Sequence, residues 1–540
     1  MNDERHLSQP QSAWLGTVPT MRTERHFDGR VVRCFADRPT STYALLADAV
    51  SSRPEGEAIV CGQERLTYAL FQRIVDGWAS ALERMGIKRG DRVAMLLGNG
   101  IAFPAVLFAV QRLGAIAVPI STREQAPGIA YMLAHCGAKV LVHDADLAPR
   151  LPAPADTARL HHRIALSPDV LRGGLDQLDS NPCTAGPSAN VDEEDVAIIL
   201  YTSGTTGQPK GAMLTHLGIC HSAMHYECCM GLTARDRSVI AVPMSHVTGV
   251  IALIAAIVRA AGTLIVMRAF KAADFLALAE RERMTHTLLV PAMYNLCLLE
   301  QLFWSADLSA WRIGGFGGAP MPTTTIERLA EKLPRLQLMN AYGATETTSP
   351  ATLMPPAKTA TKLDSVGIAV PCGEALVMDD QGREVPRGLE GEIWLRGPMV
   401  VKGYWENPEA TAESFVAGFW RSGDIGSVDA EGYMRVFDRK KDVVNRGGYK
   451  IFTIEVENAL MGHPAVAEAA VIAAPCPVLG ERAHAVVCLR GAGVTSEELS
   501  LHCARLLADY KVPDTFSFRS DPLPRNANGK IVKRALKNAY

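Results

Sequence analysis

An alternation of segments with helical and strand-like hydrophobic spacing, starting near Thr42, constrains the fold of this chain more than any other feature. The helical segments are 68–86 and 104–115, and the strand-like segments are 91–98, 115–120 and 138–144. A second alternating set covers 238–354, and short glycine-rich strands are expected over 365–436. Such alternation is typical of a parallel sheet covered by helices. The sequence therefore predicts an α/β fold for most of the chain.

The last hundred residues have a different pattern. A helical segment, two strand-like segments and a second helical segment follow one another there, which predicts a small, separate α+β domain. Five consecutive charged residues, Asp438 to Asp442, are typical of a solvated joint. We therefore expect a large domain over 41–437 and a small mobile domain over 438–540. Residues 1–40 are polar and are expected to form an irregular lead-in, and residues 151–190 a surface excursion.

Composition narrows the possible partners and the compartment. A length of 540 residues favours two or more domains. The net charge is −2 and no basic run is present, so nucleic acid is not an expected partner. The twelve cysteines form no C-x-x-C pair, which favours reduced thiols in a cytoplasmic protein. The N-terminus is too polar for a secretory signal, and the longest apolar run is about half a membrane span, so no integral membrane contact is expected.

A loop that follows the strand-like segment 196–201 points to a ligand. Its sequence, "YTSGTTGQPKG" from Tyr201 to Gly211, combines three glycines, four hydroxyl side chains and one lysine. Glycine backbone N–H groups, hydroxyls and an ammonium suit a polyanion such as a triphosphate. Pro209 stands where a Walker loop needs glycine, so this is not a P-loop NTPase. The alternative is an ordinary surface turn before a helix that begins at about Leu214.

Seven further segments follow this loop in a fixed order. They are "PMSHVTG" (243–249), "GGAPMP" (317–322), "NAYGATETT" (340–348), "GEIWLRGP" (391–398), "FWRSGDIG" (419–426), "DRKKDVVNRGGYKI" (438–451) and "PRNANGKIVKRAL" (524–536). Together with the loop they resemble the adenylate-forming superfamily of acyl-CoA synthetases, firefly-type luciferases and peptide-synthetase adenylation domains. The resemblance covers about residues 42–540. It implies a large N-terminal AMP-binding domain of α/β subdomains with a strand-rich, barrel-like part, and a small mobile C-terminal domain.

The resemblance also implies a two-step reaction with ATP, Mg²⁺ and coenzyme A. A carboxylate attacks the α-phosphorus of ATP to give acyl-AMP and pyrophosphate, and a thiol then expels AMP. The residues expected to hold the β- and γ-phosphates are Thr202, Ser203, Gly204, Thr205, Thr206 and Lys210. Glu346 is the expected magnesium ligand, because Mg²⁺ favours carboxylates together with substrate phosphates. Thr345 is expected to contact the α-phosphate.

Other residues are assigned to the nucleoside by the same resemblance. Those expected around adenine are Gly318, Ala319, Pro320, Asn340, Ala341, Tyr342 and Gly343, with the Tyr342 ring against the base. Asp424 is expected to accept hydrogen bonds from the ribose hydroxyls. Arg439 is expected to be the second ribose contact, with an exposed, ion-paired arginine as the alternative.

The C-terminal residues and one histidine complete the expected site. Lys530 is expected to bridge the carboxylate and the α-phosphate as a charge clamp. Lys441 matches the hinge of the small domain, and Gly447, Gly448 and Tyr449 match a loop that shapes the thiol tunnel. His246 matches a position that closes the acyl pocket, with a structural histidine as the alternative.

The acid is expected to be a hydrophobic fatty or aromatic monocarboxylic acid. The segments expected to line its pocket, 221–227, 247–250, 314–318 and 341–344, contain no lysine or arginine. His221 and His225 have the spacing of a zinc-binding pair, but their helix is more favoured as a wall of the acid pocket.

No carrier domain follows Tyr540, which favours free coenzyme A as acceptor over a separate carrier protein. A luciferase-like oxygenase and a nucleotide sensor are less favoured, and a homodimer is left open.

Overall fold

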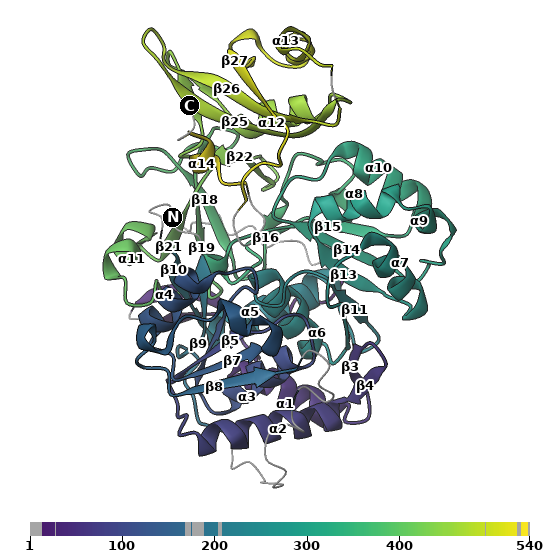
Figure 1. The fold of residues 1–540 in the computed structure, drawn as a ribbon, viewed down its shortest axis with the longest axis vertical. Helices are drawn as coiled ribbons and strands as arrows, with labels where there is room; N and C mark the ends of the chain where they lie inside the picture. Colours follow the sequence, from purple (N-terminus) through teal and green to yellow (C-terminus); the bar gives the residue numbers. More distant parts are fainter. Residues whose placement is uncertain are drawn as a thin grey trace, which may run out of the picture. The chain divides into compact units, whose positions relative to one another are not determined.

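The computed structural model describes residues 13–27, 29–167, 174, 188–202, 208–491, 493–525 and 531–537 (Figure 1). The chain divides into two compact units. The first contains Met1–Ala375 and Leu395–Trp420, and the second contains Leu376–Trp394 and Arg421–Tyr540. The domain boundary expected at Asp438 stays a prediction. In the part of the chain that the structure describes, no helix is both long and apolar enough to cross a bilayer.

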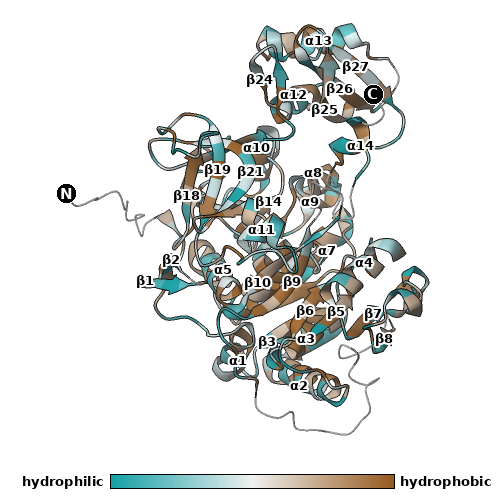
Figure 2. Cartoon of the chain, turned by 90° about the vertical axis from the view of Figure 1, so that its left-hand side faces the viewer, coloured by the Kyte–Doolittle hydropathy of each residue, from teal (hydrophilic) through white to brown (hydrophobic). Residues whose placement is uncertain are grey.

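A six-stranded sheet forms one half of the first unit. Its strands, in spatial order, are β10 (Lys210–Thr215), β9 (Val196–Thr202), β6 (Ile116–Pro119), β5 (Arg92–Leu96), β7 (Val140–Asp144) and β8 (His162–Leu166). All neighbours are parallel except β9 and β10. The strands β5, β6 and β9 are strongly hydrophobic in Figure 2, as expected for strands buried on both faces. The accompanying helices are α2 (Tyr68–Arg84), α3 (Ala102–Arg112) and α4 (Ala126–Cys136).

The spacing of apolar residues explains why α2 forms where the sequence predicts it. Thr67 caps the helix, because its side chain accepts a hydrogen bond from the Leu70 N–H. Phe71, Ile74 and Trp78 follow at helical intervals and are fully buried. The helix packs against α3, and its residues from Trp78 to Leu82 are all buried.

A nine-stranded sheet forms the other half of the first unit. Its order is β17 (Ile368–Ala369), β16 (Thr352–Leu353), β15 (Gln337–Tyr342), β14 (Ile313–Gly317), β13 (His286–Leu289), β11 (Arg237–Ile240), β12 (Thr263–Val266), β3 (Glu57–Cys61) and β4 (Glu64–Thr67). The strands from β15 to β3 in this order pair in parallel. The helices of this half are α1 (Thr42–Ser52), α5 (His216–Met230), the π-helical η5 (Thr248–Ala255), α6 (Ala256–Arg259), α7 (Ala272–Arg281), α8 (Pro291–Leu299), α9 (Gln301–Ser305) and α10 (Thr323–Lys332). The predicted α/β class is confirmed.

Three local expectations are wrong. Part of the lead-in expected to be irregular is a hairpin of β1 (Met21–His26) and β2 (Arg30–Phe35), because Val32 and Cys34 alternate with polar residues and are buried. The strand β8 lies within the expected surface excursion and pairs with β7. The helix after the glycine-rich loop begins at His216 rather than near Leu214, because Lys210–Thr215 pairs with β9 as strand β10.

The strand-rich part forms a five-stranded sheet. It contains β18 (Glu374–Met378), β19 (Gly391–Arg396), β21 (Phe419–Val428), β20 (Phe415–Val416) and β22 (Met434–Arg439), with helix α11 (Pro408–Ser414) nearby in sequence.

The second unit has a sheet of its own. The strands β24 (Tyr449–Ile451), β23 (Val444–Arg446), β26 (Gly480–Leu489) and β25 (Val466–Cys476) follow in order, and β27 (Thr515–Arg519) pairs with β26. Its helices are α12 (Thr453–Met461), α13 (Ser496–Ala504) and α14 (Lys533–Lys537). Val456, Leu460 and Leu499 of α12 and α13 share a hydrophobic core with the sheet. The expected small α+β region is therefore present.

Candidate active site

The residues expected around adenine lie at the carboxyl ends of two neighbouring parallel strands. In the register of β14 and β15, Gly317 is opposite Ala341. A Cβ atom on Gly317 would collide with the carbonyl oxygen of Ala341, so this close approach requires glycine. The segment 318–320 leaves β14, and Tyr342 ends β15, at the same edge of the sheet. The residues of 318–320 are exposed and Tyr342 is half-buried, so a flat base has access to both loops.

Glu346 lies in the short helix η6 (Thr345–Thr347) that follows this edge. Its side chain is buried, and its Oε1 accepts a hydrogen bond of 2.9 Å from the hydroxyl of Tyr404. The Thr202 hydroxyl is 3.5 Å from the same oxygen. The structure therefore brings together Glu346 and Thr202, two of the predicted site residues. Tyr404 was not predicted from the sequence.

The two described ends of the glycine-rich loop are strand neighbours. Thr202 ends β9 and Lys210 begins β10, and the two residues are register partners in this antiparallel pair. The Lys210 ammonium is 5.1 Å from the centre of the Tyr404 ring. Ser203, Gly204, Thr205 and Thr206, which were predicted to bind phosphate, lie outside the described residues.

The polar groups gathered around Glu346 suit a magnesium–triphosphate complex. They are the Glu346 carboxylate, the hydroxyls of Thr202 and Tyr404, and the Lys210 ammonium, which lies close to the same tyrosine. Mg²⁺ favours oxygen ligands and is usually held by one or two carboxylates together with substrate phosphates. The residue types present therefore fit the expected cofactor, with Glu346 as the protein ligand.

The expected acid-binding segments consist mostly of small or apolar residues and contain no lysine or arginine. His246 is half-buried, and its Nδ1 lies 3.2 Å from the Thr248 hydroxyl. Helix α5 packs against η5, whose residues from Gly249 to Ala255 are buried.

Two of the three histidines of α5, His221 and His225, are used for packing. The Nε2 of His221 accepts from the Phe35 N–H at 3.1 Å, and its Nδ1 donates to the Leu217 carbonyl at 2.9 Å. Both ring nitrogens are therefore engaged by the protein, which disfavours the zinc alternative. Burial lowers the pKa of His221 to about 3 and that of His225 well below its usual value, so both rings are neutral.

The second unit pairs the two residues expected to bind ribose. Asp424 and Arg439 are register partners on β21 and β22, and their side chains form an ion pair of 2.8 Å. Asp424 is buried, whereas the side chain of Arg439 is 45% exposed. The alternative of an exposed, ion-paired arginine thus describes Arg439 in this structure, and its predicted ribose contact stays a prediction.

The residues expected to shape the thiol tunnel form a tight hairpin. Arg446 of β23 pairs with Tyr449 of β24, and only Gly447 and Gly448 lie between them. Their φ angles are +57° and +94°, as a type I′ turn requires, which explains the glycine pair. The exposed Tyr449 ring is 4.9 Å from that of Tyr510.

The two lysines predicted for the C-terminal part have different outcomes. Lys441 is exposed in the turn after β22. Its role as the hinge of the small domain stays a prediction. Lys530 lies outside the described residues.

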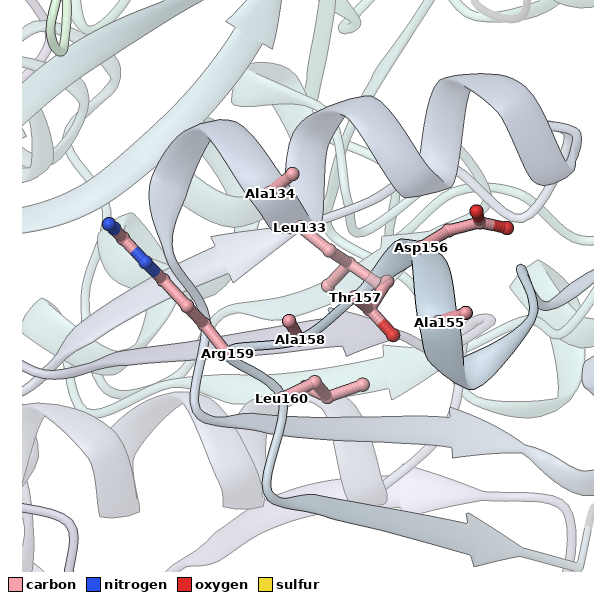
Figure 3. Close-up of a pocket in the computed structure, with 8 residues that line it drawn as sticks. All are labelled: Leu133, Ala134, Ala155, Asp156, Thr157, Ala158, Arg159 and Leu160. Carbon is pink, nitrogen blue, oxygen red and sulfur yellow. The ribbon is translucent and has the colours of Figure 1, made fainter.

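A surface hollow of about 350 Å³ lies elsewhere in the first unit, where the end of α4 meets residues 155–160 (Figure 3). The side chains of Asp156 and Arg159 point away from each other there. None of the predicted site residues lines this hollow, so it is separate from the site described above.

Two family matches together cover most of the chain. Residues 46–405 match the AMP-binding enzyme family, and residues 455–530 match the AMP-binding enzyme C-terminal domain. The chain belongs to the AMP-binding enzyme family. The resemblance stated from the motifs is thereby confirmed.

Relatives of this AMP-binding enzyme act on different acids. A feruloyl-CoA synthase from Amycolatopsis is 36% identical over 90% of this chain and 96% of its own. The long-chain-fatty-acid–CoA ligase FadD13 of Mycobacterium tuberculosis is 34% identical over 88% and 93%. The o-succinylbenzoate CoA synthetase of Bacillus subtilis, solved with ATP and magnesium, has a TM-score of 0.80, with 30% identity over 92% of this chain and 98% of its own. This protein is accordingly an AMP-forming acyl- or aryl-CoA ligase that uses ATP and coenzyme A.

Proposed function

We propose that this enzyme converts a hydrophobic monocarboxylic acid, fatty or aromatic, into its coenzyme A thioester. In this proposal Glu346 holds Mg²⁺, and Thr202 and Lys210 bind the leaving phosphates. Asp424 and Arg439 bind ribose, and Lys530 is the charge clamp. The acid is activated as acyl-AMP with release of pyrophosphate, and free coenzyme A is the acceptor.

The expected acid-binding segments offer no cation to a second carboxylate, which supports a monocarboxylic over a dicarboxylic acid. Glu227 is their one ionisable carboxylate, and its Oε2 pairs with Arg259 at 2.9 Å. His221 and His225 are buried and neutral, and no lysine or arginine lies in these segments. A second carboxylate on the substrate would be buried without a cation, which is unfavourable by about 3–5 kcal/mol.

A panel of acids scored by pyrophosphate exchange into ATP tests the proposal. Fatty and aromatic monocarboxylic acids should support exchange without coenzyme A. Dicarboxylic acids of matched length should be poorer by about 10²-fold or more, as expected for a buried, unpaired charge. Equal use of the diacids would contradict the proposed substrate class, and release of ADP and phosphate would contradict the adenylate route.

A competition between free coenzyme A and a purified phosphopantetheinyl carrier protein tests the acceptor. The side-chain-free Gly447–Gly448 turn leaves room for a slender pantetheine arm, which both acceptors carry. Because the relatives include CoA ligases, we expect coenzyme A to be acylated first. Faster loading of the carrier would favour a stand-alone acyl-AMP ligase.

The cellular location, the assembly state and the domain limits remain proposals. We propose a cytoplasmic enzyme, and a homodimer is one assembly to be tested by light scattering. The domains at 41–437 and 438–540 can be tested by limited proteolysis near Asp438.

A further inference from the structure

Tyr404 touches both charged side chains that the proposed function assigns to magnesium–ATP. It is 6% exposed and lies in the segment 399–405, which follows β19. Its hydroxyl donates to the Oε1 of Glu346 at 2.9 Å, while the Lys210 ammonium is 5.1 Å from its ring centre. One side chain therefore contacts the expected metal ligand through its hydroxyl and the expected phosphate ligand through its ring.

The backbone around Tyr404 is fixed to both neighbouring elements. Tyr404 forms an isolated antiparallel bridge with Ala212 of β10. The N–H of Val401 donates to the carbonyl oxygen of Glu346 at 2.9 Å, and the Arg30 guanidinium donates to the Val401 carbonyl at 2.9 Å. The phenol ring is therefore held at a defined place between β10, which carries Lys210, and η6, which carries Glu346.

The Tyr404 hydroxyl is the donor in its hydrogen bond to Glu346, because a carboxylate only accepts hydrogen bonds. The ring face offers Lys210 a favourable cation–π contact that leaves its N–H groups available to an anion.

An ion pair between Lys210 and Glu346 would occupy both groups before the nucleotide arrives. The described residues show no such pair: Glu346 is bonded to two hydroxyls, and Lys210 lies against the ring. We propose that Tyr404 is a positioning residue that keeps Glu346 and Lys210 apart in the free enzyme, so that each meets its own part of magnesium–ATP. This inference rests on the proposed function, because it assumes that these two residues bind metal and phosphate.

Two substitutions separate the roles of the hydroxyl and the ring. Tyr404→Phe removes the donor to Glu346 but keeps the ring against Lys210. It should reduce the gain in ATP affinity that the metal provides by ~10–10²-fold, the range for a hydrogen bond to a charged group. Metal-free ATP binding should stay nearly unchanged. Tyr404→Leu also removes the ring and lets Lys210 pair with Glu346, so both affinities should fall.

Calorimetric titration of ATP into the full chain, with and without Mn²⁺ and without acid, measures both quantities. Tyr68→Phe is the matched control, because the buried Tyr68 hydroxyl donates to the Gly262 carbonyl at 2.6 Å in the same unit. It should leave both affinities unchanged, and circular dichroism should confirm the fold of every variant. If Mn²⁺ raised the ATP affinity of both Tyr404→Phe and Tyr404→Leu by as much as it does for the wild-type protein, the inference would be overturned. A wild-type protein whose ATP affinity does not respond to Mn²⁺ would instead contradict the proposed function.

Discussion

Replacing Lys530 by alanine should slow acyl-adenylate formation by about 10²–10³-fold and leave the thioester step nearly unchanged. Negative charge develops where the carboxylate meets the α-phosphate, and one preorganised cation there is typically worth that factor in rate. The thioester step starts from the finished acyl-AMP, so it does not need this clamp. An equal loss of both steps, with the fold intact, would contradict the assignment of Lys530 to the first half-reaction alone.

Single-turnover kinetics of each half-reaction measures the effect. Acyl-AMP formation is followed from ATP and acid, and thioester formation from supplied acyl-AMP and coenzyme A. Arg534→Ala is a suitable control, because Arg534 is an exposed cation in α14, four residues after Lys530. Lys533 is unsuitable as a control, because its ammonium is 2.7 Å from Glu457 and a substitution would disturb α12.

The described residues on either side of Lys530 are well anchored, which supports this design. Arg525 and Ile531 form an isolated antiparallel bridge. The carboxylate of Glu468 accepts hydrogen bonds from the Leu523 N–H at 3.0 Å and from the Arg525 guanidinium at 2.8 Å. The described residues on the two flanks of Lys530 are thus fixed by contacts within the second unit.

The edge that carries the adenine loops was predictable because its signals are local. A strand-like pattern followed by glycine marks the ends of both β14 and β15. Parallel strands place their carboxyl ends at one edge of a sheet, so the α/β pattern places the segments 318–320 and 342–343 at the same edge. That β14 and β15 are neighbours there follows from the structure. The motif order then supplied the family and the expected ligands.

Tyr404 could not be found in this way. It lies 58 positions from Glu346, and nothing in its own segment predicts that its hydroxyl reaches that carboxylate. One sequence contains no signal for such a distant pair. The β1–β2 hairpin was missed for a different reason, because its signal is local but weak. Only Val32 and Cys34 mark the buried face of β2, and the polar residues around them suggest a loose lead-in.

The pair of Asp424 and Arg439 is an intermediate case. The motifs singled out both residues, and the sequence analysis left an ion pair as the alternative for Arg439. Their pairing depends on the register of β21 and β22, which shifts at a bulge between Ile425 and Gly426. A bulge of this kind changes which side chains are opposite each other, so the contact followed only from the structure.

Replacing Gly448 by tryptophan should have the opposite effect to Lys530→Ala. Acyl-AMP should form at a nearly normal rate, and the thioester step should fall by about 10²-fold, the effect expected when a reacting group is displaced by about 1 Å. A Cβ atom on Gly448 meets no other atom within 4 Å, so a side chain there points into open space rather than into the core. In the proposed function that space belongs to the pantetheine arm, which an indole ring would obstruct.

The positive φ of Gly448 makes a second variant necessary. Any side chain at +94° strains the turn, so Gly448→Trp combines strain with bulk. Gly448→Ala introduces the same backbone strain with a single methyl group. If bulk blocks the thiol, Gly448→Ala should keep most of the thioester rate while Gly448→Trp loses it. Equal losses in the two variants would instead mean that the thioester step depends on the geometry of the type I′ turn and that the space beside it does not admit the thiol.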